Sequence, residues 1–110
     1  MDKGKIILVP FPFTDLSGQK VRPAIVLYAQ NKGEDFIVCF ISSKQAEKVG
    51  IFDIKIKPSL QNGLKINSLI KVSKMATLEK KIALGEIGTL EKETLNKIDG
   101  KLKEIFKISK

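Results

Sequence analysis

The apolar residues of this chain fall into short runs, each closed by a turn, and this pattern limits the fold more than any other feature. The runs occupy 5–9, 24–29, 36–41, 52–57 and 64–73. The first three are almost continuously apolar, which is typical of buried strands, whereas the last two alternate apolar and polar residues, which is typical of half-exposed strands. Proline and glycine mark the turns between the runs. The pattern predicts about five strands, with Pro23 placed before the second.

The final segment differs, because its apolar residues have helical spacing. After Thr89 they fall at Leu95, Ile98, Leu102, Ile105 and Phe106. Positions with this spacing share one face of a helix. Gly100 within that helix costs about 1 kcal/mol relative to alanine, which packing must offset. We therefore expect one domain over residues 1–110, mainly β with a C-terminal α-helix, in which the short strands curl into a small barrel that hides its edges.

The residue types restrict the chemistry. The chain has no histidine and a single cysteine, Cys39. The usual zinc ligand sets and the histidine-dependent nucleophile systems are therefore excluded. No glycine-rich nucleotide-binding motif occurs either, so we predict no metal and no cofactor. Cys39 lies in the apolar run 36–41, where we expect a small buried hydrophobe.

Net charge points to the kind of partner. Twenty Lys and Arg residues against twelve Asp and Glu residues give a net charge of +8. This balance favours a nucleic acid or an acidic protein, because neutralising phosphates releases counterions. Alternatively, the lysines only keep the surface soluble. The start at 1–4 lacks the apolar stretch of a signal peptide, and no segment approaches the roughly 20 apolar residues of a membrane span. We expect a cytoplasmic protein without membrane contact.

Five sequence motifs, taken together, resemble one known family. Residues 11–27 read FPFTDLSGQKVRPAIVL, a Phe-Pro-Phe-Thr-Asp loop followed by Lys-x-Arg-Pro and an apolar strand. This pattern resembles the PemK-like branch of the MazF/PemK toxins. The resemblance continues through ISS at 41–43, GLKINS at 63–68, MATLEK at 75–80 and IGTL at 87–90. The five motifs cover almost the whole chain in the family's order.

The resemblance implies a fold, an activity and partners. The fold would be the SH3-like small barrel of the MazF/PemK/CcdB toxins, usually a homodimer. The activity would be that of a metal-independent endoribonuclease, the toxin of a type II toxin–antitoxin system, which cleaves single-stranded RNA by attack of the 2′-hydroxyl. The other partner would be an acidic antitoxin whose flexible tail lies over the basic cleft, and the antitoxin complex could bind DNA.

Two residues are implied to be catalytic. Arg22, in Lys-x-Arg-Pro, matches an active-site arginine of the family, and a guanidinium fork fits the oxygens of a phosphate. Ser42 matches the family's active-site threonine and keeps its hydroxyl group. Each residue also has a structural alternative, because Arg22 could form an ion pair at a strand end and Ser42 could serve as a turn or cap residue.

We predict that nine further residues bind RNA or line the cleft. They are Phe13, Thr14, Asp15, Lys20, Ser43, Lys71, Ser73, Lys74 and Thr77. Phe13 either stacks on a base or packs in the core at a bend. Asp15 either accepts a proton near Arg22 or forms the turn.

Three positions depart from the family pattern. One branch of the family places an arginine and an aspartate two residues apart as acid and base, where this chain has Lys71 and Ser73. Another branch has an arginine directly before the threonine that matches Thr77, where this chain has Ala76. Because a serine cannot replace a carboxylate base, the sequence leaves the general base unassigned. Slow cleavage, or none, is therefore a second expectation.

Two alternatives to an RNA-cleaving toxin stay open. The first is a catalytically weak barrel of the same fold that binds a nucleic acid or a protein. The second is a toxin of the same fold that acts on another protein, such as a DNA topoisomerase. The Lys-x-Arg-Pro motif at 20–23 and Ile-Ser-Ser at 41–43 favour the RNA-cleaving branch.

Overall fold

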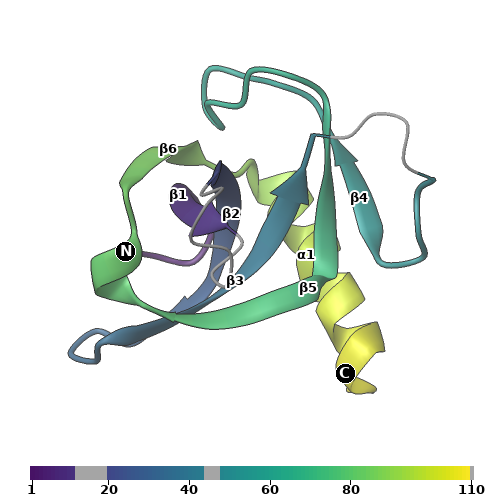
Figure 1. Cartoon of the computed structure of the whole chain (residues 1–110). Helices are drawn as coiled ribbons and strands as arrows, with labels where there is room; N and C mark the ends of the chain where they lie inside the picture. The colour runs from purple at the N-terminus through teal and green to yellow at the C-terminus, as the bar shows by residue number, and fades with distance from the viewer. Residues whose placement is uncertain (12–19, 44–47, 110) are drawn as a thin grey trace.

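The computed structural model describes residues 1–11, 20–43 and 48–109. In these residues the strands come first, with one 3-10 helix before the last strand, and a single α-helix follows at the C-terminal end (Figure 1). They are β1 (Lys5–Phe11), β2 (Lys20–Ala29), β3 (Asp35–Ser42), β4 (Asp53–Ile56), β5 (Ser68–Glu79), the 3-10 helix η1 (Lys80–Ile82), β6 (Gly85–Thr89) and α1 (Lys92–Phe106). The predicted mainly β fold with a C-terminal helix is confirmed.

The six strands form one antiparallel sheet in the order β4-β5-β3-β2-β1-β6. Figure 1 shows the sheet curling, with the long strand β5 and then η1 sweeping around β1, β2 and β3 before β6 returns to β1. The curl makes a half-barrel. As a result, the small-barrel prediction is also confirmed.

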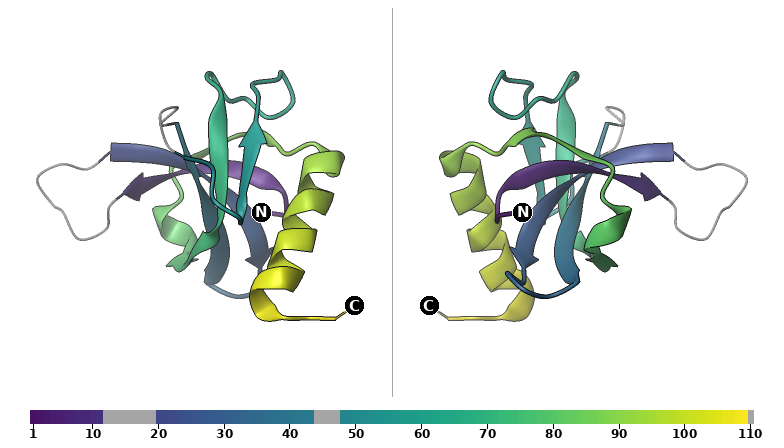
Figure 2. Two further views of the ribbon diagram at one scale, coloured as in Figure 1. Left: turned by 90° about the vertical axis from the view of Figure 1, so that its right-hand side faces the viewer. Right: turned by 90° about the vertical axis from the view of Figure 1, so that its left-hand side faces the viewer.

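Two apolar cores lie on the two faces of this sheet. On one face, α1 packs against the strands, and its fully buried Ile98 joins Ile6, Ile25, Cys39 and Ile70 of the sheet. We call this the helix face. Figure 2 shows α1 along one side of the molecule, with the ends of β1 and β2 reaching to the opposite side. Burial of Cys39 agrees with its predicted role as a small hydrophobe.

The second core lies on the other face, which we call the inner face. Its residues come from β1, β2, β3 and the second half of β5, and Ile82 and Ala83 pack against them. The buried members are Ile7, Val9, Ala24, Val26, Phe36, Val38 and Leu78. Because residues directly opposite one another in an antiparallel pair share a face, the pairs Ala24↔Phe40 and Val9↔Arg22 extend this face toward the ends of β2 and β3.

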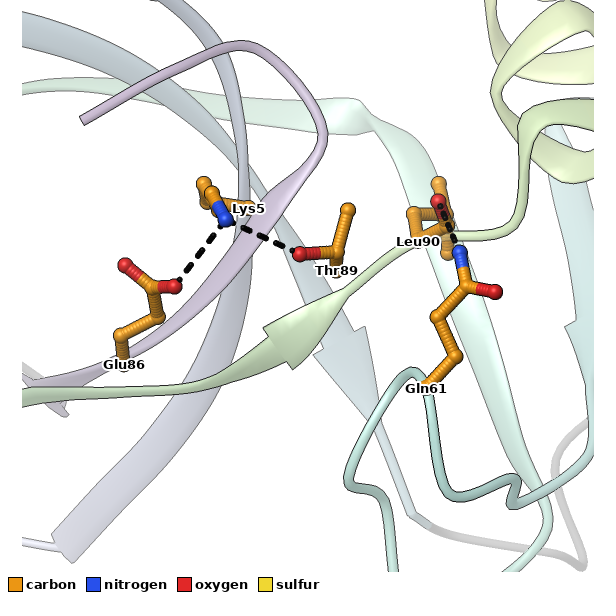
Figure 3. Close-up of polar contacts among 5 residues, drawn as sticks. All are labelled: Lys5, Gln61, Glu86, Thr89 and Leu90. Atoms are coloured by element: carbon orange, nitrogen blue, oxygen red, sulfur yellow. Dashed lines mark hydrogen bonds and ion pairs between the residues drawn. The ribbon is translucent and has the colours of Figure 1, made fainter.

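Polar contacts fasten β6 and the loop before β5 to the rest of the sheet (Figure 3). Lys5 Nζ donates a 3.1 Å hydrogen bond to Thr89 Oγ1 and lies 3.2 Å from Glu86 Oε1. Gln61 Nε2 donates to the carbonyl oxygen of Leu90 at 3.2 Å. These contacts hold β6 against β1 and lead the chain into α1.

Several predicted strand boundaries were wrong. Residues 64–67 are not a strand, because Gly63 has a φ of +72° and the Leu64 N–H donates to Asn62 Oδ1 instead of to a sheet partner. The strand β2 begins at Lys20 and therefore contains Pro23. The proline is tolerated because it pairs only with Leu8 of β1, since the β2–β3 pairing ends at Ala24.

No α-helix within 1–11, 20–43 or 48–109 is long and apolar enough to cross a membrane.

Candidate functional site

Arg22, the chain's one arginine, lies on β2 at the edge of the inner core. It pairs with the fully buried Val9 of β1. The next residue of β2 on the same face, Ala24, is also fully buried. Arg22 Nε is buried and has no hydrogen-bond partner; it is the one such buried side-chain nitrogen or oxygen in the described part of the chain. A buried donor left unsatisfied costs about 1–3 kcal/mol. Such an unsatisfied donor is uncommon in folded proteins and marks Arg22 as a candidate functional residue.

Ser42 ends β3 and is half-buried. The pairing of β2 with β3 ends at Ala24↔Phe40. Arg22 and Ser42 each lie two residues beyond this pair on their own strands, so both share the inner face with Ala24 and Phe40. The structure therefore brings the two residues that were predicted to be catalytic to the same end of the same hairpin, on one face of the sheet.

Lys71 lies on β5 directly opposite Phe40 of β3, and so also faces inward. Lys71 pairs with Asp53 of β4, and its ammonium nitrogen is 3.0 Å from Oδ2 of that residue. Only 19% of the Lys71 side chain and 8% of the Asp53 side chain are exposed. Asp53 Oδ2 also accepts a 2.7 Å hydrogen bond from the Gly50 N–H.

These side chains form one row across four neighbouring strands. Arg22 lies on β2, Ser42 on β3, Lys71 on β5 and Asp53 on β4, the order in which these strands adjoin in the sheet. Residues diagonal to one another on adjacent strands are about 7–8 Å apart, within reach of long side chains. Lys55, exposed and two residues beyond Asp53 on the same face of β4, adds a further cation. The cations of this row can therefore contact successive groups of an extended polyanion.

A bulge divides β5 into two halves. Residues of the same parity point to opposite faces of the sheet before and after it. The β3–β5 register passes from Phe40↔Lys71 directly to Cys39↔Met75, so that Val72, Ser73 and Lys74 have no partner on β3. Ser73 and Lys74 are exposed there, beside the row.

Because of this bulge, Thr77 does not join the row. It pairs with Ile37 and lies on the helix face with Met75, which packs against the helix-side core. The prediction that placed Thr77 in the same cleft as Arg22 is not supported by this geometry. Ala76, by contrast, faces inward and packs against the inner core.

The remaining predicted cleft residues either flank the row or lie outside the residues that the structure describes. Lys20 begins β2 on the same face as Arg22 and is exposed, and Ser43 is exposed just after β3. Phe13, Thr14 and Asp15 lie outside the described residues. Their predicted roles in stacking and proton transfer stay predictions.

Asp53 is the member of the row that the sequence analysis missed. The alternation Phe52-Asp53-Ile54-Lys55 was a sufficient signal that Asp53 lies on the polar face of a strand. The sequence could not tell which residue faces it, because that depends on the pairing of β4 with β5.

The described residues offer neither a metal site nor a reactive thiol. No cluster of three or more Cys, Asp or Glu residues suited to hold a metal ion occurs among the residues that the structure describes. Desolvation by burial raises the pKa of the Cys39 thiol to about 12, and a hydrogen bond to its own backbone only partly opposes this effect. Cys39 is therefore a neutral thiol at physiological pH and a poor nucleophile.

The fold and the row define the class: a small, curled antiparallel barrel that presents a cationic sheet face. Residues 2–106 match the model of the family described as PemK-like, MazF-like toxin of type II toxin-antitoxin system. The chain therefore belongs to this toxin family. No curated protein matches its sequence.

Solved structures show the same fold. MazF from Deinococcus radiodurans superimposes with a TM-score of 0.76 at 17% identity, over 98% of this chain and 97% of that one. A chain of the MazE–MazF structure from the same organism gives 0.79 at 18% identity, over 99% and 97%. An endoribonuclease in complex with its cognate antitoxin, from a mycobacterial species, gives 0.74 at 17% identity, over 98% and 96%. At these identities the likeness establishes the fold alone.

Proposed function

We propose that this toxin is an endoribonuclease that cleaves single-stranded RNA without a metal ion. The observation that carries the proposal is the buried, unpartnered Nε of Arg22, on the same sheet face as Ser42 and Lys71. A guanidinium held in place by the core, with a donor that nothing satisfies, suits the oxygens of a phosphate. The family relation supplies the reaction class, and the structural relatives include an endoribonuclease.

The proposed reaction is an internal phosphoryl transfer. The RNA 2′-oxygen attacks the adjacent phosphorus and loses its proton to a base, and the bond from phosphorus to the 5′-oxygen breaks as that oxygen gains a proton. The products are a 2′,3′-cyclic phosphate and a 5′-hydroxyl. Arg22 stabilises the negative charge that builds on the phosphoryl oxygens, Ser42 hydrogen-bonds the phosphate or the 2′-oxygen, and Lys71 adds a positive charge.

The proposed partners follow from the same face. Several basic side chains, Lys20, Arg22, Lys55 and Lys71, share the inner face near the row. An acidic antitoxin segment laid along it would block RNA by occupying the same cations. Structures of relatives with MazE or with a cognate antitoxin make such a partner the expected one. DNA binding would come through that complex, and we place the toxin in the cytoplasm.

The test is cleavage of a mixed-sequence, single-stranded RNA by the purified protein in excess EDTA. We expect cuts that leave a 5′-hydroxyl and a cyclic or 3′-phosphate. The DNA oligonucleotide of the same sequence, which has no 2′-hydroxyl, should stay intact. Loss of cleavage in EDTA and its return with added metal would exclude the proposed mechanism.

One departure from the family keeps a second candidate in view. Ser73, exposed in the β5 bulge, stands where one branch of the family has a carboxylate. A protein that binds the RNA in the same assay but leaves it uncut would be the binding barrel rather than the nuclease.

A further inference from the structure

Asp53 supplies a carboxylate to the row from an edge strand. The other acidic residues in the described parts of β2 to β5, Asp35 and Glu79, are paired with each other on the helix face. Asp53 is thus the acidic group of these strands that shares a face with Arg22, Ser42 and Lys71.

The Asp53–Lys71 pair is far more buried than other ion pairs in the described structure. The Asp53 and Lys71 side chains are 8% and 19% exposed, against 46% and 39% for Lys3–Asp99 and 77% and 55% for Lys81–Glu79. Buried ion pairs contribute little net stability relative to apolar residues, because desolvation offsets their attraction. Stability alone is therefore a weak reason for this pair.

Asp53 is itself held by two hydrogen bonds to Gly50, one through its side chain and one through its backbone. Its Oδ2 accepts the Gly50 N–H at 2.7 Å, and its own N–H donates to the Gly50 carbonyl oxygen at 3.2 Å. This reciprocal turn leads directly into β4, so the carboxylate has a fixed direction toward β5. A lysine has a long, flexible stem, and a fixed carboxylate at 3.0 Å removes much of its rotamer freedom before any ligand arrives.

We propose that Asp53 is a positioning residue, which holds the Lys71 ammonium on the sheet face where Arg22 and Ser42 meet the scissile phosphate. The inference rests on the proposed function. Asp53 acts through Lys71 and does not contact the RNA. Its own negative charge opposes RNA binding, so it favours the reaction only through geometry.

This opposition gives the proposal a distinctive signature. Asp53→Asn keeps the shape and an acceptor for the Gly50 N–H but removes the negative charge that holds the Lys71 ammonium. Turnover, kcat, should fall about 10- to 100-fold, as misplacement of a catalytic group commonly does. KM should stay the same or decrease, because one negative charge near the RNA has been removed. A purely structural role would instead lower the melting temperature and the active fraction without this split.

The experiment is a double-mutant cycle of single-stranded RNA cleavage with wild type, Asp53→Asn, Lys71→Gln and the double variant. Because Asp53 acts through Lys71, the double variant should be no slower than Lys71→Gln alone. Asp99→Asn is the matched control, since it removes the α1 carboxylate that pairs with the exposed Lys3. Its kcat should equal that of wild type.

The outcomes separate this inference from the proposed function. If wild type does not cut RNA, the function fails and the positioning role falls with it. If wild type cuts and Asp53→Asn keeps kcat within about two-fold, or the two substitutions are additive, only the positioning role is overturned. Melting curves check folding. Should Asp53→Asn not fold, the double variant decides, and a kcat clearly below that of Lys71→Gln overturns the proposal.

Discussion

Asn62 is the one fully buried polar residue that the described structure contains. Its Oδ1 accepts the N–H groups of Ser59 at 3.0 Å and Leu64 at 2.9 Å, and its Nδ2 donates to the Lys57 carbonyl oxygen at 2.9 Å and to Glu91 at 3.2 Å. One amide thus closes the loop between β4 and β5 and ties it to the start of α1.

Removing this amide should be costly. Asn62→Ala leaves two backbone N–H groups and a carbonyl oxygen without their partner, and each unsatisfied group costs about 1–3 kcal/mol. We expect the free energy of unfolding to fall by about 3 kcal/mol or more, measured by urea denaturation. The control is Asn67→Ala, at an exposed position in the same loop, which should change it by less than about 0.5 kcal/mol. Equal effects of the two substitutions would contradict this reading of the network.

Glu91, at the start of α1, links this network to pH. Partial desolvation alone would raise the pKa of its carboxyl, but hydrogen bonds from Ser59, from its own backbone and from Asn62 outweigh that effect and hold the pKa below its usual range. A carboxyl with a lowered folded-state pKa stabilises the fold above its unfolded pKa of about 4.3, and this stabilisation disappears as the pH falls through the folded value.

The wild type should therefore be more stable than Glu91→Gln at neutral pH, and the difference should shrink below about pH 4.3. Thermal melts of both proteins between pH 7 and pH 3, in steps of about half a unit, would measure it. A difference that stayed constant over this range would show that the Glu91 charge is not what the network stabilises.

At the scale of the elements, the β5 bulge decides which predicted residues meet. Period-2 alternation places Lys71 and Ser73 on one face and would place Thr77 there too, because all three are an even number of residues apart. The three unpaired residues between Lys71 and Met75 reverse that parity, so Thr77 lies on the helix face of the sheet. A bulge depends on how two distant strands pair, which no local pattern contains.

Other elements show the same division between local and long-range information. The runs at 5–9, 24–29, 36–41 and 52–57 predicted four strands correctly, because burial on a sheet shows directly as apolar content and alternation. The strand β6 was missed, since Gly85-Glu86-Ile87-Gly88-Thr89 has one large apolar side chain and two glycines. It forms because β1 offers an edge for pairing.

Strands favour branched residues, but at position 88 of β6 only glycine fits. A Cβ there would lie 2.4 Å from the backbone of Asn62 and 2.5 Å from the Gln61 carbonyl oxygen. The loop before β5 can therefore cross β6 only over a glycine, and the Thr89 N–H donates to Gln61 at this crossing, at 2.9 Å.

Two Gly→Ala substitutions should consequently have opposite effects. Gly88→Ala forces backbone apart, and we expect a loss of about 1–3 kcal/mol in the free energy of unfolding. Gly100→Ala meets nothing within 4 Å in mid-helix, and we expect a gain of about 0.5–1 kcal/mol. Denaturant melts of the two variants side by side would reveal the signs. A stabilised Gly88→Ala variant would contradict the close crossing.

The whole molecule leaves apolar side chains at its surface. Those more than half exposed are Val21, Tyr28, Ile51, Leu60, Leu84, Phe106 and Ile108. Scattered exposed apolar residues are common, but this number on so small a barrel favours burial against a second copy. We predict a homodimer in solution. Light scattering at micromolar concentrations, in the absence of an antitoxin, would measure the mass, and a monomer throughout would contradict this prediction.

Arg22 is the group that the proposed mechanism needs most, because it holds the reacting phosphate. Losing one preorganised donor to developing charge commonly slows an enzyme about 10²–10³-fold. Arg22→Ala should therefore cut RNA at least about 100-fold more slowly than wild type. Lys32→Ala, which removes an exposed charge in the β2–β3 turn, should cut at the wild-type rate.

The deciding measurement is the cleavage rate of these three proteins on one single-stranded RNA, in excess EDTA, after melting curves have shown that each is folded. Wild type and Lys32→Ala should cut at the same rate, and Arg22→Ala at least about 100-fold more slowly. Cutting by Arg22→Ala at the wild-type rate would contradict the proposed mechanism.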